Sequence, residues 1–125
     1  MKQYLVDTTV FIDHFRGKSS ATEFLQKPDL IVPYVVVGEL LQGARNKEEL
    51  RLIHAFVSHY QIHWGSAHIH EKAIELLSIY YLVDGIQLLD SIIAAMALLD
   101  GFIVVTDNIK HFQKISDLSV IRIEK

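Results

Sequence analysis

The sequence contains no cysteine and no hydrophobic run long enough to cross a membrane. Without cysteine, neither a disulfide framework nor a thiolate metal site is possible, which fits a reducing cytosol. The longest uncharged apolar stretch, residues 91–99, has 9 residues, whereas a membrane-spanning helix needs roughly 20. The N-terminal segment "MKQYLVD" is too short before its first acid to be a signal peptide. We therefore expect a soluble, cytoplasmic protein with no membrane contact.

Basic residues are slightly outnumbered by acidic ones, with 12 Lys and Arg against 15 Asp and Glu, giving a net charge of −3. This balance argues against a dedicated duplex-DNA binder, because such proteins are usually basic. It leaves a nucleic-acid enzyme open, because an acidic metal site adds negative charge that bound cations would cancel. No G-x-G-x-x-G or Walker loop is present, so nucleotide cofactors have no support.

Apolar periodicity and chain breakers predict strands that alternate with helices. The expected strands are residues 3–6, 30–32, 61–64, 102–106 and 119–123, and the expected helices are 9–15, 19–26, 34–44, 46–58, 66–82 and 88–100. Asn46, Ser66 and Ser19 or Ser20 are the expected N-caps. Such alternation in a chain of 125 residues predicts one domain, 1–125, with the α/β class of fold: an α/β/α sandwich around a parallel sheet of about 4–5 strands.

Polar residues follow two of the predicted strands. Asp7 follows the first strand, and Asp107 and Asn108 follow "FIVVT". Carboxyl ends of parallel strands meet at one edge of a sheet, where ligands bind. Glu39 lies in the helix that begins after the second strand, and Asp90 lies in the first turn of the apolar helix 88–100. We therefore expect these five side chains to converge on one pocket.

Each of these residues also has an ordinary structural interpretation. Asp7 and Asp90 are typical helix caps, Glu39 alone is typical of a solvated helix face, and Asp107–Asn108 is typical turn chemistry. If they converge, two carboxylates about 4 Å apart repel by roughly 4 kcal/mol at an effective dielectric near 20. A divalent cation between them would offset that cost, and an all-oxygen site suits Mg²⁺ or Mn²⁺. Such ions support phosphodiester cleavage.

Four segments carry a resemblance to a known family. "YLVDTTVFID", "VVVGELLQGA", "LLDSIIAAMALLDGFIVVTDNIKHF" and "LSVIRI" resemble, in order and spacing, the PIN-domain ribonucleases of the VapC toxin type. The resemblance runs from Tyr4 to Ile123. It implies a Mg²⁺- or Mn²⁺-dependent endoribonuclease that pairs as a homodimer and is neutralised by a VapB-like antitoxin whose C-terminal segment lies across the acidic pocket.

By position, the resemblance implies that Asp7, Glu39 and Asp90 are the catalytic acids. Asp7 and Asp90 would be the principal metal ligands, and Glu39 would hold a second ion or a water molecule. The family's fourth acid corresponds to Asn108, which brings no charge, with Asp107 just before it. The hydroxyls of three threonines would orient these ligands; they are Thr8, Thr9 and Thr106.

The substrate implied by the resemblance is a loop of transfer or ribosomal RNA, whose unstacked bases can enter a pocket. The candidate contacts to its backbone are Arg16, Lys18, Arg45, Lys47 and Lys110, although each is equally typical of solvated surface charge. Two alternatives stay open. One is the same metal chemistry on another phosphate substrate, either single-stranded DNA or a phosphatase substrate. The other is a catalytically weak or inert binding module, which Asn108 favours.

The seven histidines do not indicate a metal site. His59 and His63 are four apart, but His63 falls in an expected strand, and no H-E-x-x-H pattern occurs. We expect His111, in "KHF", to pack or cap locally rather than to act as a base. The apolar content of residues 34–58 is high for a small monomer and suggests a dimer face or an antitoxin groove.

Overall fold

A computed structural model describes residues 2–123 of the chain. The strands are β1 (Tyr4–Val6), β2 (Leu30–Pro33), β3 (Gln61–His63), β4 (Ile103–Val105) and β5 (Val120–Ile121). The helices are α1 (Thr8–Phe15), α2 (Ser19–Phe24), α3 (Tyr34–Gln42), α4 (Lys47–Val57), α5 (Ala67–Asp84) and α6 (Leu88–Asp100), with a short 3₁₀ helix η1 (Ile109–His111). Every predicted strand and helix is present, and the ends differ by up to two residues.

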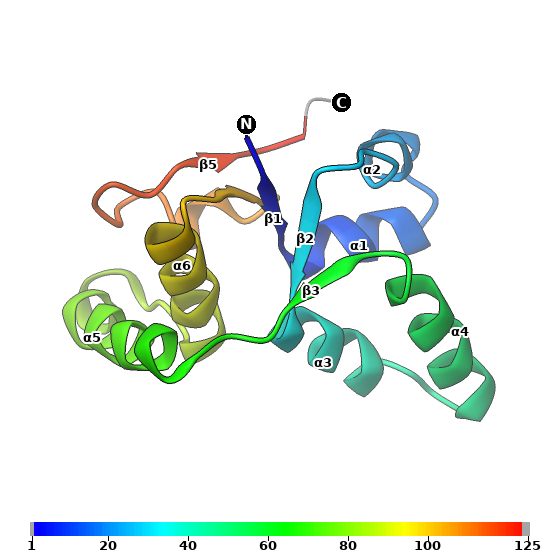
Figure 1. Ribbon diagram of the computed structural model, residues 1–125, viewed down its shortest axis with the longest axis horizontal. Helices are drawn as coiled ribbons and strands as arrows, with labels where there is room; N and C mark the ends of the chain where they lie inside the picture. The colour runs from blue at the N-terminus through cyan, green and yellow to red at the C-terminus, as the bar shows by residue number, and fades with distance from the viewer. Residues whose placement is uncertain (1, 124–125) are drawn as a thin grey trace.

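The five strands form one parallel sheet in the order β3-β2-β1-β4-β5. Val6 pairs with Val105, and Pro33 pairs with His63, so the carboxyl ends of the strands share one edge. Figure 1 shows α5 and α6 on one side of the sheet and α1, α2 and α4 on the other, with α3 below the strands. The predicted α/β/α sandwich is confirmed, and β5 is an edge strand, as expected.

The core is built around α6 and the central strands. The helix buries eight consecutive residues from Asp90 to Ala97, so no side of this stretch faces solvent, whereas Leu99 and Asp100 at its end are exposed. Val104 and Val105 of β4 are fully buried, as expected for a strand covered on both faces. Burying α6 fixes its N-terminal turn against the sheet, and this turn carries Asp90.

Two of the three predicted N-caps are confirmed, and one is wrong. The side chain of Asn46 accepts a hydrogen bond from the Glu49 N–H, and Ser66 does the same for Ile69, as predicted. The predicted serine cap of α2 is wrong, because the helix begins at Ser19 and its N-cap, Lys18, makes no side-chain bond. Gly101 ends α6 with φ of 76°, a left-handed conformation that favours glycine.

No helix within residues 2–123 is both long and apolar enough to span a bilayer.

Candidate active site

Asp7 lies where β1 passes into α1, and its side chain is not used as a helix cap. The residue occupies the N-cap position of α1, but its carboxylate makes no capping bond. Instead Asp7 Oδ2 accepts a hydrogen bond of 2.7 Å from Thr106 Oγ1 and one of 3.3 Å from Thr9 Oγ1. Asp7 is 5% exposed. The structure therefore favours the functional interpretation of Asp7 over the capping one.

Thr106, directly after β4, joins the two strand ends. Besides donating to Asp7, its hydroxyl accepts a hydrogen bond of 2.9 Å from the Asn108 backbone N–H. Thr9 accepts a bond of 3.0 Å from the Asp107 backbone N–H. Arg122 donates to the Asp107 carbonyl over 3.2 Å. The loop after β4 is thus fixed against Asp7 mainly through its backbone and two threonine hydroxyls.

Asp90 is the third residue of α6, and it both caps the helix and faces the site. Its Oδ2 lies 3.4 Å from the Gln87 backbone N–H, one half of a capping box with Gln87. The same oxygen lies 3.1 Å from Nδ1 of His111 in η1. Besides its local contact with Asn108, His111 thus makes a long-range contact that was not expected, because the loop after β4 brings its ring to a residue 21 positions away.

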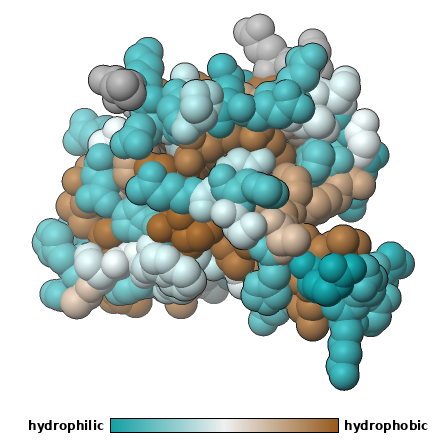
Figure 2. Space-filling model, turned by 45° about the vertical axis from the view of Figure 1, so that its right-hand side comes forward, coloured by the Kyte–Doolittle hydropathy of each residue, from teal (hydrophilic) through white to brown (hydrophobic). Residues whose placement is uncertain are grey.

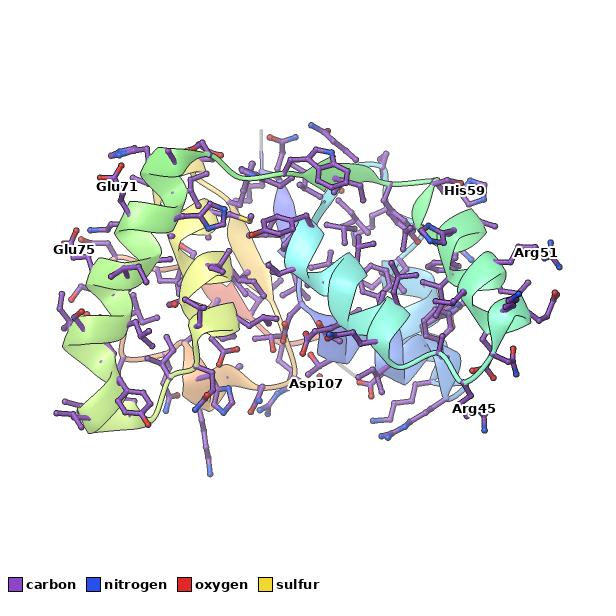
Figure 3. All side chains as sticks on the ribbon, turned by 90° about the horizontal axis from the view of Figure 1, so that it is seen from below. Arg45, Arg51, His59, Glu71, Glu75 and Asp107 are labelled. Atoms are coloured by element: carbon purple, nitrogen blue, oxygen red, sulfur yellow. The ribbon has the colours of Figure 1, made fainter. Side chains whose placement is uncertain are left out.

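Glu39 enters the site from α3. Thr8, the first residue of α1, donates a short hydrogen bond to Glu39 Oε1. Thr8 is buried, and it is the neighbour of Asp7, so this bond places Glu39 beside the acids of the sheet edge. Seen from below in Figure 3, Asp107 lies near the middle of the molecule, between α3 and the α5–α6 side.

Asp90 lies near enough to both Asp7 and Glu39 to interact with them electrostatically. Burial raises the pKa of the Asp7 carboxyl, and the charge of Asp90 raises it further, against hydrogen bonds that lower it. Burial also raises the pKa of Asp90, with His111 lowering it and Glu39 raising it. The N-termini of α1 and α6 favour negative charge here. The site nevertheless holds more buried negative charge than its hydrogen bonds stabilise.

The side chains at this edge are of the chemical type that binds a hard divalent cation. Carboxylate oxygens from Asp7 after β1, from α3 and from α6, backed by threonine hydroxyls, are the ligands that Mg²⁺ and Mn²⁺ prefer. Within residues 2–123, no three His, Asp or Glu side chains stand close enough to form a finished metal site. Asp7, Asp90 and Glu39 are the residues that would hold a cation, and they would have to close around it.

Asn108 and the five candidate RNA-binding residues have different contacts in the structure. The Asn108 amide is directed at His111, 3.2 Å from its Nδ1. Lys18 forms an ion pair with Asp13 over 3.4 Å, and the Nε and Nη2 atoms of Arg45 both donate to the Glu49 carboxylate. Arg16 lines the groove described next, while Lys47 and Lys110 are exposed.

An apolar groove of about 940 Å³ begins at the acids and runs between α1, α3 and α4. Thr8 and Glu39 stand at one end, and Arg16, Arg45 and Glu49 supply charge along it. Its apolar lining consists of Ile12, Phe15, Leu40, Leu52, Ile53 and Phe56. Phe15 and Leu52 are 50% and 54% exposed. Figure 2, with the right-hand side of Figure 1 turned forward, shows apolar surface among hydrophilic residues on this part of the molecule.

Sequence reasoning missed His111 and Gln87 as parts of this site. Both act on Asp90, Gln87 from three residues before it and His111 from the loop after β4. The sequence did carry a signal for Gln87, which stands three residues before Asp90, at the capping-box spacing. For His111 it indicated only the contact with Asn108, which lies one turn before it.

Comparison with known proteins agrees with this fold. The PIN domain family matches residues 4–118, so the chain belongs to this family. The resemblance inferred from the sequence is thereby confirmed at the level of the family. No curated protein matches the sequence significantly.

Solved structures of toxin–antitoxin systems share the fold over nearly their whole length. A toxin–antitoxin complex from Klebsiella pneumoniae is similar with a TM-score of 0.83 and 26% identity, over 98% of this chain and 99% of that one. DNA-bound VapBC from Salmonella typhimurium gives 0.81 and 20% over 98% of each chain. VapC20 from Mycobacterium tuberculosis, a sarcin-ricin loop cleaving toxin, gives 0.72 and 17% over 94% and 99%. The last two similarities show the fold alone.

Proposed function

We propose that this single-domain protein is a Mg²⁺- or Mn²⁺-dependent endoribonuclease toxin of the VapC type, acting in the cytoplasm. The observation that carries the proposal is the convergence of buried Asp7 and Asp90, with Glu39 beside them, at the carboxyl edge of a parallel sheet. Their raised pKa values mark a site with unbalanced negative charge. Carboxylates gathered at such a cost are typical of a functional site.

The protein's own residues divide the work of this site. Asp7 and Asp90 would be the main ligands of the cation, and Glu39 would orient water or a second ion. When bound, a divalent cation lowers the pKa of water and stabilises charge on a reacting phosphate. Thr106 and Thr9 hold the Asp7 carboxylate, and Thr8 holds Glu39. Asp107 and Asn108 stay candidates for a further ligand.

RNA would reach these acids from the solvent side of the same edge. Arg16, Lys47 and Lys110 are the better candidates for backbone contacts, because Lys18 and Arg45 are engaged with Asp13 and Glu49. Ion pairs this exposed are weak, so the two engaged residues could still exchange partners with a phosphate. An exposed loop of transfer or ribosomal RNA remains the proposed substrate class, since its backbone is accessible.

A VapB-like antitoxin is the proposed partner, and the apolar groove is its proposed binding site. The Klebsiella pneumoniae protein of similar fold was solved as a toxin–antitoxin complex. The groove offers apolar side chains from three helices and ends at Glu39. A helix lays its apolar face into a groove of this kind, and a basic residue beyond that helix would reach the acids. Such binding would block the nuclease site directly.

A homodimer is proposed as well. Large apolar side chains are exposed at the end of α5 and the start of α6, with Leu82 92% and Val83 71% exposed. An apolar patch of this kind marks a protein contact. Light scattering of the purified toxin, with Leu82→Glu as the disruptive variant, tests this assembly; a monomeric wild type would contradict it.

Cleavage of a mixed transfer and ribosomal RNA pool tests the proposed activity. Purified protein, free of antitoxin, is incubated with Mg²⁺, Mn²⁺ or EDTA, beside Asp7→Ala and a matched single-stranded DNA. Cutting of RNA that needs metal and is lost in the variant supports the proposal. Preferential cutting of DNA supports the alternative nuclease. No cutting by folded protein supports the inert binding module, which the uncharged Asn108 favours.

A further inference from the structure

Asp7 and Asp90 differ in what holds them. Two threonine hydroxyls bond the Asp7 carboxylate. Among the described residues, Asp90 has only the Gln87 N–H, at 3.4 Å, and His111 Nδ1, at 3.1 Å. His111 in turn lies 3.2 Å from the Asn108 amide. We propose that Asn108 and His111 form a positioning pair for Asp90, in which Asn108 orients the imidazole and the imidazole orients the carboxylate. This inference rests on the proposed function.

The chemistry of the contacts fixes the proton on His111. An ionised carboxylate only accepts hydrogen bonds, so Nδ1 must carry hydrogen to bond Asp90. An N–H at that nitrogen cannot accept from the Asn108 NH₂ group. In the structure the amide nitrogen of Asn108 lies 3.2 Å from Nδ1. The positioning pair therefore requires a half-turn of the Asn108 side-chain amide, which exchanges two similar-looking atoms and brings its oxygen to Nδ1. In that orientation His111 donates from Nδ1 to Asp90 and Asn108 together.

The pair is anchored to the same network that holds Asp7. The Asn108 backbone N–H donates to Thr106 Oγ1 over 2.9 Å, and that hydroxyl donates to Asp7. Phe112, the residue after His111, is fully buried and holds η1 against the core. A continuous chain of hydrogen bonds therefore runs from Asp7 through Thr106, Asn108 and His111 to Asp90. This chain of contacts links Asp7, which follows β1, to Asp90 in α6.

This arrangement explains why an uncharged residue can occupy position 108. Asn108 acts through His111, so it needs an oxygen that accepts a hydrogen bond and does not need a charge. Side chains that orient metal ligands typically change metal affinity or activity by about 10–100-fold when removed. A loosely held Asp90 would bind a cation less tightly and place it less accurately, which lowers kcat more than it raises KM for RNA.

A double-mutant cycle separates this role from direct ligation by Asn108. The variants are His111→Ala, Asn108→Ala and both together, with exposed His68→Ala as the matched control. The readouts are the Kd for Mn²⁺ by calorimetry in the absence of RNA, and kcat and KM for cleavage. We expect His111→Ala to weaken Mn²⁺ binding and lower kcat, each about 10–100-fold, with KM within about two-fold.

Non-additivity is the decisive result. If Asn108 acts through His111, the double variant matches His111→Ala, whereas independent metal ligation by Asn108 makes the two effects multiply. His111→Asn, whose amide N–H can take the place of Nδ1–H, should recover at least about tenfold of the lost activity. Multiplying effects, or wild-type Mn²⁺ affinity in His111→Ala, would overturn the proposal. Circular dichroism and Tm verify folding of each variant.

A nitrogen-15 NMR spectrum of the His111 ring keeps this test separate from the nuclease assignment. In metal-free protein we expect Nδ1 to carry hydrogen and its resonance to shift in Asp90→Asn and Asn108→Ala. A ring protonated only at Nε2 would contradict the positioning pair, whether or not RNA is cleaved. A protonated Nδ1 with these shifts, in a wild type that neither cuts RNA nor binds Mn²⁺, would keep the geometry and reject the proposed function.

Discussion

The acidic edge, formed by Asp7, Glu39, Asp90 and their threonine partners, contrasts with the apolar groove beside it. At the edge, Asp7, Asp90 and Thr106 are buried, Glu39 reaches them from an exposed position on α3, and hydrogen bonds from neighbouring elements fix Asp7 and Glu39. In the groove, apolar side chains from three helices are exposed to solvent. Each region places residues in the environment that folding alone disfavours. This difference supports the proposal that the two regions serve separate tasks, chemistry at the edge and partner binding in the groove.

Removing an acid should separate the two tasks most sharply. Asp7→Ala should lower RNA cleavage on the order of 10³-fold, the scale seen when one preorganised electrostatic group is lost. Binding of a cognate antitoxin should weaken far less than cleavage, because the apolar contacts of the groove remain and Asp7 does not line it. Cleavage kinetics and calorimetry measure the two. Glu71→Gln on the exposed face of α5 is the control for charge. Cleavage at the wild-type rate would refute the assignment of Asp7.

A charged residue in the groove should give the opposite pattern. Leu52→Glu places a carboxylate where we expect an apolar helix to pack, and Leu52 is already 54% exposed, so folding should tolerate it. We expect antitoxin Kd to rise about 30-fold, corresponding to roughly 2 kcal/mol, with cleavage within about twofold. Ile79→Glu, equally exposed on α5, is the control. Equal losses from both variants would contradict a specific role for the groove.

Thr106 sharpens the comparison within the edge itself. Thr106→Val removes the hydroxyl that donates to Asp7 and accepts from Asn108. We expect kcat to fall about 10-fold or more, as for other partners of metal ligands, and a loss of about 1–3 kcal/mol of stability from buried polar groups left unpaired. Thr106→Ser should restore both. Activity that survives in the valine variant would mean that this hydroxyl only supports folding.

The smallest expected effect is on stability without metal. A raised pKa means that folded Asp7 binds its proton more tightly than the unfolded chain does. Stability is therefore greatest at pH below the unfolded pKa, falls as pH rises through the folded value, and stays reduced above it. At pH 7 in EDTA, Asp7→Asn should therefore raise Tm by a few °C. A lower Tm would contradict the excess of negative charge.

Much of the fold could be predicted because its signals are local. The burial of α6 follows from its continuous apolar sequence, and Asn46 and Ser66 specify helix starts by their own side chains. The N-cap of α2 was missed because two adjacent serines were both candidates, whereas Lys18 takes the cap position without a side-chain bond. Boundaries defined by a single hydrogen bond are the part that propensity determines least.

The site could be predicted only in part because its contacts are long-range. A parallel sheet places the strand ends together, so the proximity of Asp7 and Thr106 followed from topology. The contact of His111 with Asp90 depends on the path of the loop after β4, which periodicity does not encode. The groove likewise depends on how α1, α3 and α4 pack. Apolar content suggested a partner surface and could not give its shape.

Mn²⁺ binding measured by calorimetry tests the central claim most directly, because it examines the acidic edge without RNA or antitoxin. Wild-type protein, Asp7→Asn and Asp90→Asn are titrated at pH 7, with Glu71→Gln as control. We predict saturable binding by wild type and Glu71→Gln, and a loss of at least about tenfold in affinity in each of the other two. Equal Mn²⁺ affinity in all four proteins, or no binding by folded wild type, would contradict the claim that these acids form a metal-dependent nuclease site.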